Sequence, residues 1–195
     1  MSSAPLDRLS QPARDLLKLN VTDAYTNLVV TGAGNAQAYP LLTQLTPQNV
    51  LSSPSKDPDE SAALVAGLWL WHDFLDESHK IAQQLQTPSG SMWHAIMHRR
   101  EGDFSNSKYW YARCENHPCL PTLAAQANEV INPFPADKQI LKLTAHGWNS
   151  DAFVDLVEAV CDRPDDPRHK LAIALQQLEW RVLFDHCMRG AGAAD

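Results

Sequence analysis

The sequence lacks the marks of membrane-spanning, exported and nucleic-acid-binding proteins. Its longest nearly apolar run, 62–71, is ten residues long, about half of what a membrane-spanning helix needs. The N-terminal segment, Met-Ser-Ser-Ala-Pro-Leu-Asp-Arg, has no apolar signal core. Basic residues are the minority, 16 against 23 acidic ones, and the formal charge is −7. Such a charge disfavours nucleic acid or an anionic membrane surface as a partner, and we expect neither.

Cysteine is scarce, and several catalytic motifs are missing. The chain has four cysteines, Cys114, Cys119, Cys161 and Cys187. They include no C-x-x-C pair, which is typical of reduced thiols and predicts a cytoplasmic protein. No G-x-S-x-G or P-loop motif occurs, and Gly32-Ala33-Gly34 lacks the strand–helix context of a dinucleotide site. A nucleophilic couple of Cys114 or Cys119 with His117 has no further support in the sequence.

The spacing of proline predicts the fold class. Proline is missing from 59–87, 89–117, 136–163 and 168–195, where long helices can form because proline inside a helix costs about 3 kcal/mol. No alternating strand pattern occurs anywhere. A chain of 195 residues, 44% of them hydrophobic, is typical of one domain. We therefore predict a single-domain all-α helical bundle over 1–195, with a loop-rich N-terminal part at 1–57, histidine-bearing helices at 58–117 and C-terminal helices at 118–195.

Capping residues and apolar spacing predict the helix bounds. Asp57-Pro58-Asp59-Glu60 is typical of a helix start, and apolar residues at helical spacing predict one helix over 59–86 with His79 in its buried stripe. A turn at 87–91 leads to a helix at 92–101, which Gly102 ends, and Asp103 can cap a third helix at 104–115. The other predicted helices lie near 5–18, 22–30, 120–130, 137–146, 149–162 and 167–189.

Histidine is the informative residue type. His72, Asp76 and His79 stand at i, i+4 and i+7 of the first predicted helix. The second repeats this spacing with His94, His98 and Glu101. Residues at such intervals project from one face of a helix. Two imidazoles four residues apart can reach one metal ion, and a carboxylate can complete the ligand set.

The turn between the two helices brings these sets together. In an antiparallel hairpin centred near Pro88, His79 lies level with His98, with His94 one turn away and Glu101 on the other side. This arrangement can hold zinc, iron, manganese or nickel. The alternative is that each histidine is a hydrogen-bonded core residue.

The segment after Glu101 offers partners for such a site. Asp103 and Asn106 can orient ligating imidazoles, and Tyr109 and Trp110 can line an apolar pocket. Trp69, Trp71 and Trp93 lie near the same hairpin, and such an aromatic wall suits a flat, hydrophobic small molecule. The same residues could instead form a structural network. Outside this region, the sequence predicts loop or surface positions for His117 and His169, a helix end for His146 and core packing for His186.

Three segments form a composite motif: Trp71-His72-Asp73-Phe74-Leu75-Asp76-Glu77-Ser78-His79, Trp93-His94-Ala95-Ile96-Met97-His98-Arg99-Arg100-Glu101-Gly102-Asp103, and 106–111. The stretch from Leu68 to Pro118 resembles a family of small fungal and bacterial proteins through this motif. The best-understood members are fungal cyclopenases, zinc proteins described as haemocyanin-like. The resemblance covers about a quarter of the chain.

The resemblance implies a zinc-dependent lyase of quinolone alkaloid biosynthesis. Its reaction converts cyclopenin to viridicatin through epoxide opening, ring contraction and loss of methyl isocyanate, with zinc as a Lewis acid. We expect zinc at His79, His94, His98 and Glu101; His72 would be the acid–base residue, and Tyr109 would position the small aromatic substrate. Two alternatives remain: a metal-dependent hydrolase or transferase on a similar bundle, and a metal-free helical binding protein. The sequence does not indicate the oligomeric state.

Overall fold

Helices form every named element of the structure, a computed structural model that describes residues 6–19, 24–114, 116–135 and 137–192. Within these ranges β-structure is limited to two isolated bridges, Leu9 with Leu51 and Ala145 with Gly147. The predicted all-α fold class is therefore confirmed. In chain order the elements are η1 (Leu6–Arg8), α1 (Gln11–Lys18), α2 (Tyr39–Leu42), α3 (Pro58–Trp71), α4 (Leu75–Ala82), α5 (Pro88–Glu101), α6 (Phe104–Ala112), α7 (Leu120–Ile131), α8 (Lys138–Leu141), α9 (Ser150–Val160) and α10 (Pro167–Ala191).

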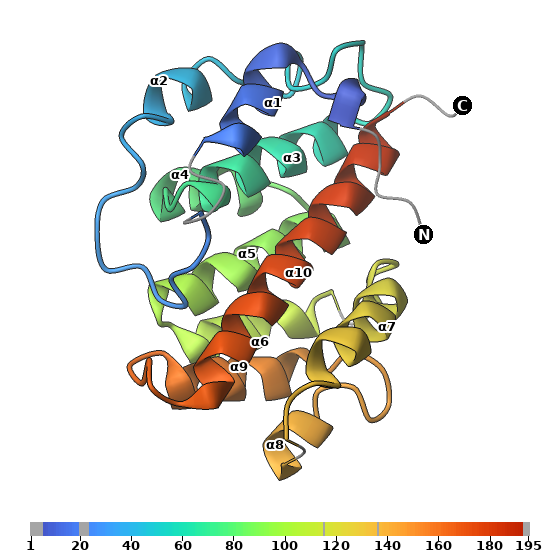
Figure 1. Cartoon of the computed structure of the whole chain (residues 1–195). Helices are drawn as coiled ribbons and strands as arrows, with labels where there is room; N and C mark the ends of the chain where they lie inside the picture. The colour runs from blue at the N-terminus through green and yellow to red at the C-terminus, as the bar shows by residue number, and fades with distance from the viewer. Residues whose placement is uncertain (1–5, 20–23, 115, 136, 193–195) are drawn as a thin grey trace.

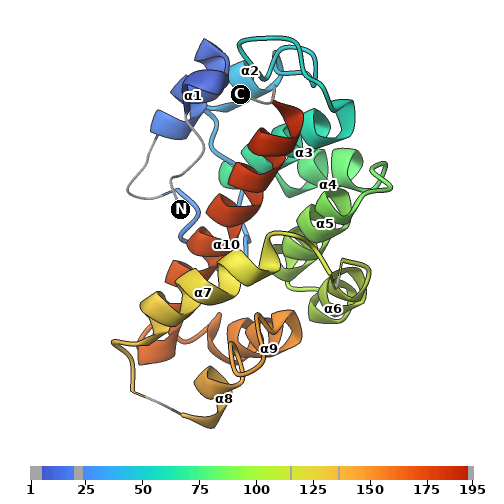
Figure 2. The ribbon, with the colours of Figure 1, turned by 90° about the vertical axis from the view of Figure 1, so that its right-hand side faces the viewer.

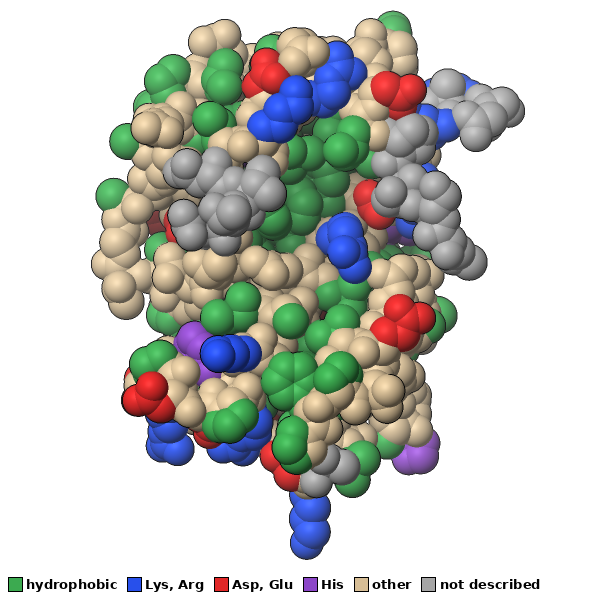
Figure 3. Space-filling model, in the orientation of Figure 1, with side chains coloured by type: hydrophobic (Ala, Val, Ile, Leu, Met, Phe, Trp, Pro, Cys, Tyr) green, Lys and Arg blue, Asp and Glu red, His purple; other side chains and the backbone are tan. Residues whose placement is uncertain are grey.

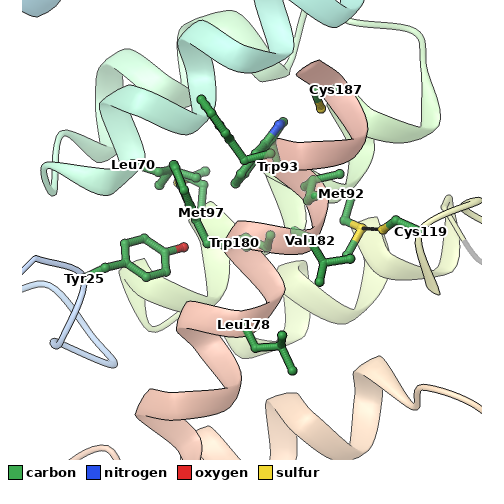
Figure 4. Packing of buried hydrophobic residues seen from close by; sticks show 14 of the residues in the cluster. Tyr25, Leu70, Met92, Trp93, Met97, Cys119, Leu178, Trp180, Val182 and Cys187 are labelled. Atoms are coloured by element: carbon green, nitrogen blue, oxygen red, sulfur yellow. Dashed lines mark hydrogen bonds between the residues drawn. The ribbon is translucent and has the colours of Figure 1, made fainter. Parts of the chain in front are cut away.

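The long helix α10 organises the bundle. It crosses most of the molecule and packs against α3, α7 and α9 (Figure 1). Along the chain, α3 contacts α4, α4 contacts α5, and α5 contacts α6, so these four helices form a stack beside α10 (Figure 2). The core lies between the stack and α10. There Trp180 of α10 faces Trp93 of α5 at a ring-centroid distance of 6.1 Å (Figure 4).

A glycine sets how closely α5 approaches α3. A Cβ atom added at Gly67 would lie 2.7 Å from the Trp93 ring, so only glycine allows this contact. The backbone of the same glycine also binds α10, because Trp180 Nε1 donates to Gly67 O at 2.9 Å. The result is that α5, which carries three of the four predicted metal ligands, is held at the centre of the molecule.

The single helix predicted over 59–86 is wrong, because the chain breaks at 72–74. The predicted start is confirmed, since Asp57 accepts from the amides of Asp59 and Glu60. However, α3 ends at Trp71 and α4 begins at Leu75. Tertiary contacts made by Arg100 stabilise the break. Its Nη1 donates to Leu70 O at 2.8 Å, and its Nη2 lies 2.6 Å from Asp73 Oδ1. The backbone of Asp73 has a φ of +66°, which no helix residue adopts.

Other bounds also differ from the predictions. No helix forms over 24–30, and the remainder of the predicted helix, 20–23, lies outside the described residues. The helix predicted at 137–146 is only the short α8. The helix predicted at 92–101 begins earlier, at Pro88, because the Thr87 hydroxyl accepts from the Gly90 amide and caps it. Gly102, with a φ of +89°, ends that helix as predicted.

All four cysteines are free, so none of them forms a disulfide.

No helix within the described ranges reaches the length and apolarity of a membrane span. On the face shown in Figure 3, acidic and basic side chains of the described residues are interspersed, with no broad basic patch.

Candidate metal centre

Helix α5 supplies two histidines that the core holds in place. His94 and His98 stand one turn apart, and their side chains are buried, as are all residues from 89 to 100. Their ring centroids lie 4.8 Å apart, and the ring planes differ by 18°. A helix packed on all sides, as α5 is, fixes its side chains because few rotamers remain open to them.

His79 of α4 completes the group. Its ring centroid lies 4.6 Å from that of His94 and 5.3 Å from that of His98. One ring nitrogen from each of the three histidines lies within 4.8 Å of the others, close enough to bind one ion. It is the one group of three or more such residues found among the described residues. The three predicted histidines therefore lie together, although the His79 ring lies nearer to His94 than to His98, with which it was expected to be level. We call these three residues the histidine triad.

The electrostatic environment favours the neutral form of two triad residues, His79 and His94. Burial and the neighbouring His79 and His98 lower the pKa of His94 to about 4. Burial and His98 also lower the pKa of His79, although Glu101 and Asp76 oppose the shift. Metal coordination needs the free lone pair of a neutral imidazole, so at neutral pH His79 and His94 are in the form that binds a metal.

One atom of the triad lacks the partner that a core histidine would have. His94 Nδ1 is buried, and it makes no hydrogen bond to any described residue. The same ring stacks on Trp110 of α6 at a centroid distance of 3.9 Å and an interplanar angle of 19°. Buried polar atoms in folded proteins nearly always have a partner. This nitrogen is therefore free to bind a metal ion, and the triad could hold one.

Glu101 contacts the triad without joining it. Its Oε2 lies 3.1 Å from His98 Nδ1, and since a carboxylate only accepts, the proton is on Nδ1. This leaves Nε2 as the nitrogen of His98 that can bind a metal. Glu101 was predicted as a ligand, but the structure places it against a ligand, in the position from which carboxylates orient metal-binding histidines.

The structure places His72 at the end of α3, where both ring nitrogens have other partners. Its Nε2 donates to Leu16 O at 3.1 Å, and its Nδ1 lies 3.5 Å from Asn35 Nδ2. Burial lowers the pKa of this side chain, although the hydrogen bond to Leu16 and the charge of Asp73 oppose the shift. His72 was predicted to share one helix face with His79, and the break at 72–74 separates the two. Its contacts are those of a structural residue that links α3 to α1.

Most of the residues that were predicted to support the site have other contacts. Asp103 caps α6 and accepts from the Asn106 side chain at 3.1 Å, so these two bind each other. Tyr109 is 56% exposed and contacts Trp110 edge-on. The other predicted aromatic residues belong to the core: Trp93 is fully buried, Trp71 stacks on Tyr25, and Trp69 packs against Phe74. Trp110 is the aromatic residue in contact with the triad.

A buried ion pair anchors α5 next to the triad. Arg99 Nη2 lies 2.6 Å from Glu179 Oε2 of α10, and both side chains are fully buried. Tyr111 of α6 donates to Glu179 Oε1 at 2.7 Å and accepts from Arg99 Nη1 at 2.5 Å. Burial alone would lower the pKa of Arg99, but Glu179 and the nearby tyrosines raise it above the ordinary value. This network joins α5, α6 and α10, and the sequence does not predict it.

The remaining histidines lie outside the triad. His117 is buried rather than a surface residue, with its ring 4.7 Å from that of His186 and its Nε2 3.1 Å from Ser89 Oγ. Burial lowers the pKa of His117 to about 4. His146 is exposed, and His169 lies in the first turn of α10. Among the described residues, the histidines that could hold a metal ion together are therefore His79, His94 and His98.

Comparison with known proteins finds no match to a family model, to a curated protein or to a solved structure. The fold and the triad together define the class of the protein: an all-α bundle with three histidines that could hold one metal ion.

Proposed function

We propose that the protein is a metal-dependent enzyme that holds one divalent transition metal, zinc first, at the histidine triad. The observation that carries the proposal is the convergence of three imidazoles from two helices. Three protein ligands with an open fourth position are typical of catalytic zinc sites, whereas structural zinc sites have four protein ligands. When bound, zinc would supply Lewis-acid activation of a substrate oxygen.

The surrounding side chains have definable tasks in such a site. Glu101 holds the proton on His98 Nδ1 and so fixes the tautomer of that ring. Trp110 covers one face of His94 and excludes water from it. His79 is only half-buried, so the triad is approached by solvent and substrate on the α4 side. The carboxylate of Glu101 contacts the triad at His98, and its side chain is 52% exposed. We therefore propose Glu101, in place of His72, as the residue that transfers protons.

The specific reaction that we propose is the lyase reaction of cyclopenin. A carbon of the fused benzene ring bonds to the epoxide carbon as its C–O bond breaks, and methyl isocyanate leaves, so that viridicatin and methyl isocyanate together contain every atom of cyclopenin. The attacking carbon is the one that bears the lactam carbonyl, and methyl isocyanate is released as this aryl–carbonyl bond and the bond from the methylated nitrogen to the oxygen-bearing ring carbon break. The phenyl-bearing carbon of the former epoxide then loses its proton and the released oxygen gains one, a transfer that suits a carboxylate such as Glu101. Support for this reaction comes from the similarity of residues 68–118 to cyclopenases and from a metal-binding group inside that stretch.

Metal analysis tests the site. Protein purified without a histidine tag is expected to contain about one equivalent of a divalent ion, as zinc sites with three histidine ligands do. His94→Ala and His98→Ala should lose the ion, and His169→Ala, on the first turn of α10, should keep it. Less than about a tenth of an equivalent of any transition metal, even after reloading with Zn²⁺, would overturn the metal proposal.

Incubation with cyclopenin tests the reaction separately. Metal-loaded protein should produce viridicatin and methyl isocyanate, and a chelator should stop it. Glu101→Gln should lower the rate by about 10²–10⁴-fold with the metal still bound, because proton transfer contributes that much. If metal-loaded protein leaves cyclopenin unchanged, the lyase proposal fails while the metal analysis still decides on the site.

A further inference from the structure

A pocket lies beside the triad, at the start of α5. Its volume is about 510 Å³, and its lining includes Leu85, Thr87, Ser91, Trp110 and Arg113. These residues come from the α4–α5 turn, the first turns of α5, and α6 with its C-terminal end. A volume of this size accommodates a small organic molecule.

The pocket shares a wall with the candidate metal centre. Trp110 lines the pocket and stacks on the His94 ring at 3.9 Å. Ser91, another lining residue, stands one turn before His94 on α5. A molecule bound in the pocket would therefore contact the indole that covers a metal ligand.

The lining has one charged group, and its sign is positive. Arg113 is exposed, its guanidinium carbon lies 5.2 Å from the Trp110 ring centroid, and its Nη1 donates to Tyr109 OH at 3.4 Å. None of the lining residues is acidic, and among the described residues no carboxylate forms an ion pair with Arg113. In a chain with a formal charge of −7, a cation that lies beside an indole and has no ion-pair partner among the described residues favours a negatively charged ligand.

We infer that this pocket binds a small aromatic carboxylate. The aromatic ring packs against Trp110, since stacked or edge-on ring contacts are favourable at such a surface. The carboxylate accepts hydrogen bonds from Arg113, whose planar guanidinium matches carboxylate geometry with two parallel N–H groups. The pocket hydroxyls of Thr87 and Ser91 can donate further hydrogen bonds.

Titration with benzoate, followed by NMR, tests this inference. The signal is the indole resonance of Trp110, which is assigned by its disappearance from the spectrum of Trp110→Phe. Binding should persist after treatment with a chelator, because the pocket does not use the triad. Arg113→Gln should weaken benzoate binding about tenfold or more, since a charge-assisted hydrogen bond contributes on that scale. The matched control is Arg163→Gln, which changes an exposed arginine that forms an ion pair with its neighbour Asp162 and does not line the pocket, and this variant should bind benzoate as the wild type does.

Two further measurements separate this site from the metal. Benzamide, which has the same ring without the charge, should bind at least tenfold more weakly than benzoate. Benzoate binding that disappears with the chelator and is unchanged in Arg113→Gln would show that benzoate binds at the triad instead, and would overturn the inference. Equal binding of benzamide and benzoate, or no shift of Trp110 with either, would also overturn it. Each of these results is independent of the cyclopenin assay.

Discussion

Loss of the charge on Glu179 should destabilise the protein strongly, although this residue lies outside the triad. Glu179→Gln preserves the size of the side chain and an acceptor for Tyr111, and it removes the charge that pairs with Arg99. Both partners are fully buried, with Arg99 Nη2 and Glu179 Oε2 2.6 Å apart. Breaking one partner of a buried ion pair costs about 3–5 kcal/mol, because the other charge is left without compensation.

A surface pair in the same protein gives the comparison. Lys108 Nζ lies 2.5 Å from Asp155 Oδ1, closer than the buried pair, but the two side chains are 35% and 54% exposed. Water screens such a pair, so Asp155→Asn should cost only about 0–1 kcal/mol. Burial, and not the distance between the charged atoms, is therefore expected to decide the difference between the two variants.

Urea unfolding of chelator-treated protein, followed by circular dichroism, measures both costs. With an m-value of about 2 kcal/mol/M, Glu179→Gln should lower the unfolding midpoint by about 1.5–2.5 M. Replacing both partners, as Arg99→Met with Glu179→Leu, should restore part of the loss because no buried charge remains. A loss below about 1 kcal/mol for Glu179→Gln, equal to that of Asp155→Asn, would refute this reasoning.

Three further predictions follow from contacts and pKa shifts. Gly67→Ala should cost about 1–3 kcal/mol in urea unfolding, because its Cβ would lie 2.7 Å from Trp93, whereas Gly32→Ala, which meets nothing within 4 Å, should cost far less. Glu101→Gln should weaken zinc binding by about 10–100-fold in a competition titration; complete loss, as in His94→Ala, would instead make Glu101 a ligand. The melting temperature of chelator-treated protein should fall as the pH drops from about 6.5 to about 4, because burial lowers the pKa of His94 and of His117 to about 4 and the unfolded chain then binds more protons. A melting temperature that is constant over this range would contradict the third prediction.

Local signals in the sequence were sufficient for much of the fold. Asp57 before Pro58, Asp103 before α6 and Gly102 after α5 each predict a helix end, and each acts through contacts within a few residues. The short turn between α4 and α5 likewise brings His79 next to His94 and His98, at ring-centroid distances of 4.6 and 5.3 Å. For the same reason the histidine triad could be predicted before the structure was known.

The features that could not be predicted arise between distant parts of the chain. The break at 72–74 is stabilised by Arg100, and Asn35 N donates to His72 O at 2.9 Å. Both residues are distant from the break in the sequence, so the residues next to it do not predict it. That break removes His72 from the face of His79, and its ring nitrogens instead lie near Leu16 O and Asn35 Nδ2. Likewise Arg99 forms an ion pair with Glu179 of α10. The hydrophobic spacing of that helix predicts a buried apolar stripe and gives no sign of a buried charge.

The break between α3 and α4 also bears on how quickly the triad could exchange its ion. Two of the nitrogens stand on α5, inside the core, while the third is carried by α4, a helix of eight residues with only Ser78 and Ala82 buried. A helix this short is marginal by itself and depends on its packing against α3 and α5. Transient undocking of α4 would reduce a three-nitrogen chelate to a two-nitrogen one, so the off-rate of the ion is expected to follow the opening rate of α4 rather than that of the whole protein.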